Sequence, residues 1–96
     1  MLKIVYTDNF SEYMRSLKDI TLHTLILKRL ERVSLGNFGD TKLLSQGIYE
    51  LRIHYGSGHR IYYTKKGNEF VILLCAGDKS SQKENIKLAQ KIAKEV

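Results

Sequence analysis

The segment from Ile48 to Thr64 constrains the fold more than any other part of the chain, because it reads as two alternating strands around a Gly-Ser-Gly turn. Alternation places successive side chains on opposite faces of a sheet. If residues 56–58 form a three-residue loop, Tyr55 lies opposite His59 and the strands share an apolar face, formed by Leu51, Ile53, Ile61 and Tyr63. A two-residue loop would mix the faces and scramble the core, so we expect the three-residue loop.

The other face of this hairpin is expected to be cationic. It gathers Arg52, His54, Arg60 and Tyr62. Arginine binds phosphate oxygens through its planar fork, and imidazole gains and loses a proton near neutral pH. The sequence therefore predicts a small patch with the chemistry to bind a phosphodiester.

The N-terminal third predicts a strand at residues 2–6 followed by a helical hairpin. Thr7-Asp8-Asn9 and Asp19 offer side chains that cap helix N-termini, and Gly36 is suited to a left-handed C-cap. Apolar side chains recur at helical spacing in both helices, namely Phe10, Tyr13, Met14 and Leu17, then Leu22, Leu25, Ile26, Leu30 and Val33. The second helix is expected to turn four side chains to water, Lys28, Arg29, Glu31 and Arg32.

A loop through Lys42 is expected to lead into the hairpin, and a turn at 65–68 leads to a strand at 69–75. Both faces of that strand are apolar, as in a central strand covered on both sides. A final helix is expected to run to about Lys94. The order predicts one α+β domain over residues 1–96, with an N-terminal strand and a helical hairpin packed on a mostly antiparallel four-stranded sheet, and a C-terminal helix.

The chain carries 16 Lys and Arg against 10 Asp and Glu, a formal net charge of +6. This excess favours an anionic partner, whether nucleic acid, an acidic protein or a membrane surface, although a solvated basic surface is the alternative. The single cysteine, Cys75, is expected to be buried and unreactive. No cluster of Cys and His suggests a metal site, and no apolar segment is long enough to span a bilayer. We therefore expect a cytoplasmic protein without a metal or cofactor.

Further basic side chains are expected near the start of the last helix. If that helix returns beside the sheet, Lys79 joins Arg52 and Arg60, and the helix N-terminus adds its own affinity for anions. Ser80 and Ser81 serve equally well as plain helix caps. Beyond them lies a stripe that either faces water or contacts an anionic partner, made of Lys83, Lys87 and Lys91.

Three segments together resemble the RelE/ParE superfamily of bacterial toxins, and most closely its HigB-like branch of phage-derived addiction module killer proteins. They are Gly36-Asn-Phe-Gly-Asp40, Tyr49 to Tyr63, and Leu73 to Gln82. The resemblance implies a RelE-like, microbial-ribonuclease-like fold and a toxin of a type II toxin–antitoxin system. RelE- and HigB-type members cut mRNA in the ribosomal A site, whereas ParE-type members poison DNA gyrase. We expect the ribosome-dependent mRNA endonuclease, with gyrase inhibition as the alternative.

The resemblance also implies roles for single residues. Arg60 matches an arginine that would clamp the transition state, Arg52 a position that contacts the RNA backbone, and Lys79 a basic position after the last strand. With His54 as the acid–base candidate, these residues form the expected catalytic group. RNA contacts are expected from Lys42, Tyr62, Lys65 and Lys83.

Two departures from the family's pattern keep the alternative open. Some RelE nucleases carry a catalytic tyrosine in the C-terminal helix, where this chain has Glu84-Asn-Ile-Lys87. His59 replaces the aromatic residue that usually precedes the arginine. A structural role is also open for Arg52, as a surface ion pair with Glu50, and for His59, as a side chain that packs on Tyr55.

The resemblance implies a protein partner, a cognate antitoxin whose acidic or amphipathic segment covers the basic site or packs along the helices. A nuclease of this type would also bind the 70S ribosome and mRNA, and it would reach operator DNA only through the antitoxin. The charge of +6 favours fast, electrostatically steered association with such partners. No membrane partner is expected.

Overall fold

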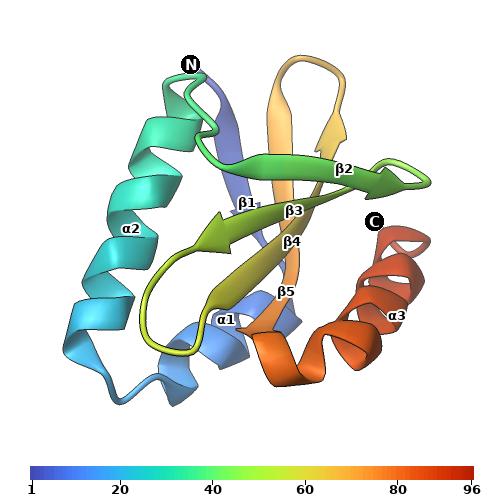
Figure 1. Ribbon diagram of the computed structural model, residues 1–96. Helices are drawn as coiled ribbons and strands as arrows, with labels where there is room; N and C mark the ends of the chain where they lie inside the picture. Colours follow the sequence, from blue (N-terminus) through green and yellow to red (C-terminus); the bar gives the residue numbers. More distant parts are fainter.

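A five-stranded sheet in the order β1-β5-β4-β3-β2 divides the molecule, and helices cover both of its faces (Figure 1). The computed structural model describes residues 1–96. Only β1 and β5 run parallel, and the other neighbours are antiparallel. The elements are β1 (Lys3–Tyr6), α1 (Asp8–Ser16), α2 (Ile20–Ser34), β2 (Thr41–Ser45), β3 (Ile48–Ile53), β4 (His59–Lys66), β5 (Phe70–Asp78), a 3₁₀ turn η1 (Lys79–Ser81) and α3 (Gln82–Ala93).

The predicted capping residues start and end the helical hairpin. The side chain of Thr7 accepts the backbone N–H of Phe10 at the start of α1, and that of Asp19 accepts the N–H of Leu22 at the start of α2. Gly36 takes the left-handed conformation, with φ at +91°, directly after α2. The Thr7 hydroxyl also donates to the carbonyl of Leu73 at 2.7 Å, which fixes α1 against β5.

The two faces of the sheet carry separate apolar cores. The α1–α2 hairpin covers one face, where twelve buried residues, Phe10, Ile26 and Leu51 among them, form one cluster. Helix α3 covers the other face, where seven buried residues include Ile48, Leu74 and Ala89. Strand β5 contributes to both clusters, so the interpretation of 69–75 as a central strand is confirmed. The predicted α+β arrangement is confirmed as well.

The sheet has five strands, and the prediction of four is wrong. Residues 41–45, expected to be part of a loop, form β2 and pair antiparallel with β3. The sequence Thr-Lys-Leu-Leu-Ser lacks strict alternation, and a register shift between Leu43 and Ser45 interrupts the pairing. Leu43 remains 56% exposed. Backbone pairing with β3, rather than an apolar pattern of its own, makes this edge segment a strand.

The predicted register of the β3–β4 hairpin is also wrong, by two residues. Ile53 lies opposite His59 and Arg52 opposite Arg60, so the connection spans residues 54–58. The longer loop is held by Tyr55, whose hydroxyl donates to the Asp19 carboxylate at 2.9 Å and ties the loop to the start of α2. A shift of two residues preserves the faces, because side chains alternate with a period of two. The apolar face predicted from the sequence is therefore intact in the core.

Arg29 does not face water as predicted. Its guanidinium reaches from α2 to the backbone at the end of β3, where Nη1 donates to the carbonyl of Arg52 at 2.6 Å. Burial lowers the pKa of Arg29 below its ordinary value. A helical pattern shows which side of a helix is polar, but it does not show that a polar side chain will find a carbonyl to bind.

No helix of this protein is both long enough and apolar enough to cross a membrane.

Two isoleucines in α2 test the position of the first core. Ile26 has no exposed surface, whereas Ile20 is 82% exposed. We expect Ile26→Ala to lower the free energy of unfolding by about 2–5 kcal/mol, because the truncation leaves a cavity. The matched variant Ile20→Ala should change it by less than about 0.5 kcal/mol. Urea denaturation followed by circular dichroism measures both, and equal losses would contradict this placement of α2.

Candidate functional site

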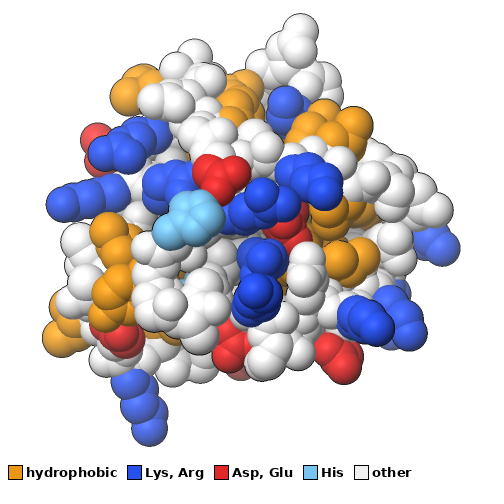
Figure 2. Space-filling model, in the orientation of Figure 1, with side chains coloured by type: hydrophobic (Ala, Val, Ile, Leu, Met, Phe, Trp, Pro, Cys, Tyr) orange, Lys and Arg blue, Asp and Glu red, His pale blue; other side chains and the backbone are white.

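A hollow opens at one end of the sheet, where β3 ends, β4 begins and β5 passes into η1. The loop 54–58 forms much of its wall, and the cationic side chains come from three separate elements. Arg52 projects from β3, Arg60 from β4 and Lys79 from η1. Figure 2 shows Lys and Arg side chains gathered across this side of the molecule, with acidic atoms between them. The structure thus brings together the three cations that the sequence placed in one group.

A buried carboxylate, Glu50, lies beneath these arginines. It is only 1% exposed, and it accepts hydrogen bonds from Arg52 Nε at 2.9 Å and Gln82 Nε2 at 3.0 Å. Arg60 Nε lies 3.3 Å from Glu50 Oε2, within ion-pair distance but not aligned for a hydrogen bond. Arg52 and Arg60 lie directly opposite each other, where like charges repel. Glu50 offsets that repulsion.

Sequence reasoning gave Glu50 only a minor part, as a surface partner of Arg52. The pair exists, but its acid is buried at the centre of the face. The alternation along β3 could have predicted this position, because Glu50 and Arg52 are two residues apart and therefore point to the same face. An acid at that position, on a face shared with two arginines, indicates a charge-compensating role.

Arg52 and Arg60 differ in how much of each guanidinium remains free to bind an anion. The hydrogen bond to Glu50 raises the pKa of Arg52, whose side chain is 34% exposed and also lies 3.9 Å from Asp40. The Arg60 side chain is 16% exposed, and its terminal nitrogens make no hydrogen bond within the protein. Those nitrogens belong to a side chain that lines the hollow. Arg60 is thus held at its Nε end and is open to an anion at its tip.

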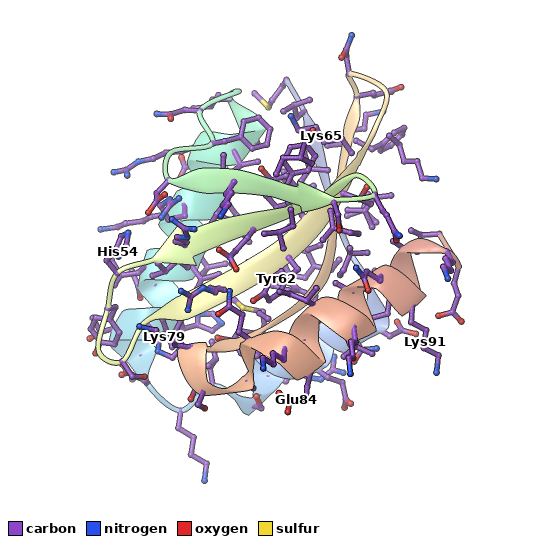
Figure 3. The ribbon with its side chains drawn as sticks, turned by 45° about the vertical axis from the view of Figure 1, so that its right-hand side comes forward. His54, Tyr62, Lys65, Lys79, Glu84 and Lys91 are labelled. Carbon is purple, nitrogen blue, oxygen red and sulfur yellow. The ribbon has the colours of Figure 1, made fainter.

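The prediction that Tyr62 contacts RNA is wrong. Tyr62 has no exposed surface and packs in the core beneath α3 (Figure 3). Its hydroxyl points to the Glu50 carboxylate at 3.4 Å, and burial together with that negative charge raises the pKa of the hydroxyl. The alternation correctly placed Tyr62 on the polar face, but α3 covers this half of the face.

His54 lies at the rim of the hollow, beyond the end of β3. Its side chain is 77% exposed, and Nε2 lies 2.5 Å from Oδ2 of Asp40. This contact is the main reason that the pKa of the Asp40 carboxyl lies below its ordinary value, and Arg52 adds to the effect. Asp40 ends the segment Gly36–Asp40, and the sequence alone assigns this carboxylate no role.

The remaining predicted RNA contacts lie at different distances from the hollow. Lys42 is exposed and pairs across β2 and β3 with Glu50, so it shares the face of the site. Lys83 is exposed in the first turn of α3. Lys65 lies toward the far end of β4, away from His54 and Lys79 (Figure 3). Its Nζ sits 4.5 Å from the Phe38 ring and 4.6 Å from the Tyr49 ring, on the α2 side of the sheet.

The turn into α3 is capped by Asp78 rather than by a serine. Asp78 accepts the N–H of Ser80 at 3.0 Å and its hydroxyl at 2.6 Å, and these bonds lower the pKa of Asp78. Ser81 makes no side-chain cap, although its hydroxyl accepts from Asn85. Gly77 permits this close turn, because a Cβ there would lie 2.1 Å from the Asn85 amide nitrogen. The turn orients Lys79 but leaves its serine hydroxyls engaged within the protein.

Cys75 lies outside the hollow, whereas His59 is one of the residues that line it. Cys75 is buried beneath α3, and burial raises the pKa of its thiol to about 12, as expected of an unreactive cysteine. His59 lies 6.5 Å from Tyr55 between ring centroids, and its Nδ1 is buried without a hydrogen-bond partner. Of the two histidines that line the hollow, His54 is the more exposed.

Comparison with known proteins finds a family profile, a relative and a solved structure that are similar to this chain. The profile of the family described as phage-derived protein Gp49-like (DUF891) matches residues 12–96. A protein of Haemophilus influenzae, strain Rd, described as uncharacterised, is 41% identical over 95 residues, which cover 99% of this chain and 96% of that protein. A free-state structure of a double arginine-to-alanine mutant of the E. coli toxin RelE matches with a TM-score of 0.74. It is 17% identical and covers 95% of this chain and 97% of that one, which confirms the RelE-like fold predicted from the sequence.

The buried carboxylate can be tested through stability. We expect Glu50→Ala to lower the free energy of unfolding by about 2–3 kcal/mol, since it leaves two opposed arginines without their counter-charge and both retain some access to water. The matched variant Glu69→Ala removes an exposed ion pair with Lys3, whose loss should cost less than about 1 kcal/mol. Urea denaturation at pH 7 compares the two, and a loss for Glu50→Ala no larger than for Glu69→Ala would contradict the role of Glu50.

Proposed function

The chain belongs to the phage-derived Gp49-like family, and on this basis we propose that it is a HigB-like toxin of a type II toxin–antitoxin system, a ribosome-dependent mRNA endonuclease that inhibits translation. The observation that carries the proposal is the tip of Arg60, which lines a cationic hollow and has no partner within the protein. The RelE-like fold is consistent with it. The match to an uncharacterised relative adds no activity of its own.

The proposed reaction needs no metal. The 2′-hydroxyl of one nucleotide loses its proton to a general base, and its oxygen attacks the adjacent phosphorus. The bond from phosphorus to the 5′-oxygen breaks, a general acid protonates the departing oxygen, and a cyclic 2′,3′-phosphate remains. Negative charge grows on the phosphoryl oxygens in the transition state, where preorganised cations act most strongly.

Arg60 is the residue we assign to that charge. Its Nε lies 3.3 Å from Glu50 Oε2, and its side chain lines the hollow before a substrate arrives. A planar guanidinium can bind two phosphoryl oxygens at once, which a lysine cannot do. Arg52 and Lys79, on either side, would bind the phosphates of the RNA backbone and hold the RNA in place. Lys42 and Lys83 extend the basic surface beyond the hollow.

His54 is the residue we assign to proton transfer. It is the exposed imidazole of the site, and imidazole can both take and give a proton near neutral pH. His54 and Arg60 both line the hollow, so one bound RNA segment can reach both side chains.

The open form of the site agrees with a need for the ribosome. Positioning of the reacting groups supplies a large part of the barrier reduction in such reactions. A shallow surface site positions a flexible RNA poorly, so we expect the ribosome to hold the codon in place. In the cell an antitoxin with an acidic or amphipathic segment would cover the basic surface and would connect the complex to operator DNA.

Gyrase inhibition without nuclease activity is the second candidate. One observation favours it: α3, with the sequence QKENIKLAQKIA, presents no tyrosine to the site, unlike the C-terminal helix of some RelE nucleases. A protein of this kind would need only a binding surface. Damage to DNA with intact mRNA, on expression in cells, is the result that would select it.

Primer extension on mRNA from a reconstituted translation reaction tests the proposal. We expect wild-type protein to cut at the A-site codon only when ribosomes are present. Arg60→Ala should slow cutting on the order of 10²–10³-fold, because a preorganised donor to the transition state is lost. Arg15→Ala is the matched control, since this α1 arginine is 69% exposed and lies outside the hollow.

Two other outcomes of this assay would contradict the proposal or part of it. Intact mRNA with wild-type protein and unimpaired translation would reject the nuclease. Normal cutting by a folded Arg60→Ala variant would reject the role of this arginine while leaving the activity in place. Circular dichroism of both arginine variants shows whether they are folded.

A further inference from the structure

At the rim of the hollow, the Asp40 carboxylate bonds the side chain of His54, and Arg29 lies within hydrogen-bond distance of the Asp40 carbonyl. We propose that Asp40 and Arg29 are positioning residues, which together hold His54 in the orientation for proton transfer. The catalytic role of these residues rests on the nuclease function proposed above. Their contacts with His54 and with the backbone can be tested in the free protein. Neither residue touches the substrate in this proposal, and both act through His54.

Asp40 gives His54 its single hydrogen bond to the rest of the protein. The imidazole is largely exposed and lies outside the sheet, so without this contact it would sample several rotamers. An ionised carboxylate only accepts hydrogen bonds, so His54 Nε2 is the donor across the 2.5 Å contact. In the neutral ring Nδ1 then carries the free lone pair. The geometry therefore assigns Nδ1 of His54 as the atom that takes a proton.

Arg29 fixes the backbone on both sides of this contact. From α2, its Nη1 donates to the carbonyl of Arg52 and its Nη2 to the carbonyl of Phe38 at 3.2 Å, with the carbonyl of Asp40 at 3.5 Å. Arg52 lies two residues before His54, and Phe38 lies two residues before Asp40. One guanidinium thus ties the end of β3, which leads to the histidine, and the loop that carries the carboxylate to the same helix.

Gly39 is the residue that lets the guanidinium approach. Its φ of +65° favours glycine, and a Cβ there would lie 3.0 Å from Arg29 Nη2 and 3.4 Å from its Cζ. The Arg52 N–H donates to the Asp40 carbonyl at 3.0 Å, which closes the arrangement. Gly39-Asp40 is therefore a turn shaped by Arg29, and it aims a carboxylate at His54.

The pKa of Asp40 reports on this arrangement directly. The hydrogen bond from His54 is the main cause that lowers it, and the charges of Arg52 on β3 and Arg29 on α2 lower it further. These groups are the charged and titratable partners that act on the carboxyl. Loss of the His54 contact should bring the pKa of Asp40 back toward its ordinary value, whereas a change elsewhere on the surface should leave it where it is.

Carbon-detected NMR of the Asp40 carboxyl during an acid titration measures this pKa in each variant. We expect a clear rise in His54→Ala, because the largest stabilising partner of the carboxylate is gone. Gly39→Ala should raise it as well, since the added methyl displaces Arg29 and the loop. Gly67→Ala is the matched control, with a φ of +57° and open space around the position, and it should leave the pKa unchanged.

A second pair of variants tests the guanidinium fork itself. Arg29→Lys keeps the positive charge but cannot bond the carbonyls of Arg52 and Phe38 together, so we expect the pKa of Asp40 to rise. Arg32→Lys makes the same change at an exposed position one turn along α2 and should have no effect. An Asp40 pKa that is the same in wild type, His54→Ala and Arg29→Lys would overturn the proposal.

The cleavage assay then tests whether the contact between Asp40 and His54 serves catalysis. Asp40→Ala should lower kcat by up to about 10²-fold with little change in KM, because a misplaced base costs reaction rate rather than binding. Asp40→Asn should recover most of the rate, since its amide oxygen can accept the same N–H bond. If wild-type protein cuts no mRNA, the nuclease proposal fails, and the Asp40 titration still decides whether the positioning contacts exist. Full activity of Asp40→Ala would overturn the positioning role alone.

Discussion

The candidate site depends on one buried carboxylate. Two arginines directly opposite each other on neighbouring strands repel each other unless a negative charge lies close to both. Glu50 supplies that charge from the same face, and Gln82 of α3 and Tyr62 complete its hydrogen bonds. A buried charge is tolerable only when it is paired and hydrogen-bonded. The network therefore joins the core beneath α3 to the cationic hollow at the end of the sheet.

The division of the sheet into two faces explains where reactive groups can lie. The α1–α2 hairpin closes one face, and α3 closes half of the other, so Tyr62 is buried while Arg52 and Arg60 reach its open half. The hairpin still influences the open side, because Arg29 extends around the end of β3 to carbonyls there. A small domain with a single sheet can hold a surface site in this way without a deep cleft.

Much of the fold was predictable because its signals are local. Thr7, Asp19 and Gly36 cap helices through bonds within a few residues, and the apolar alternation in 51–63 survives a change of register by two residues. The edge strand β2 was not predictable in this way, since its pairing partner rather than its own pattern makes it a strand. The burial of Tyr62 was likewise missed, because it depends on where a helix some twenty residues farther along the chain comes to lie.

The sequence by itself determined the caps and the two faces of the hairpin, with Arg52 and Arg60 on one face, because each follows from short-range spacing and alternation. Lys79 joins these arginines through the path of the chain after β5, which the tertiary structure decides. Only the tertiary structure decided which of the polar residues remain accessible and what each one binds. It buried Glu50 between the arginines, gave His54 a carboxylate partner from a distant loop, and moved Lys65 onto aromatic rings. The pairings of Glu50 with Arg60, His54 with Asp40 and Lys65 with Phe38 join separate segments of the chain. Their energies depend on burial and on distances that no local pattern encodes.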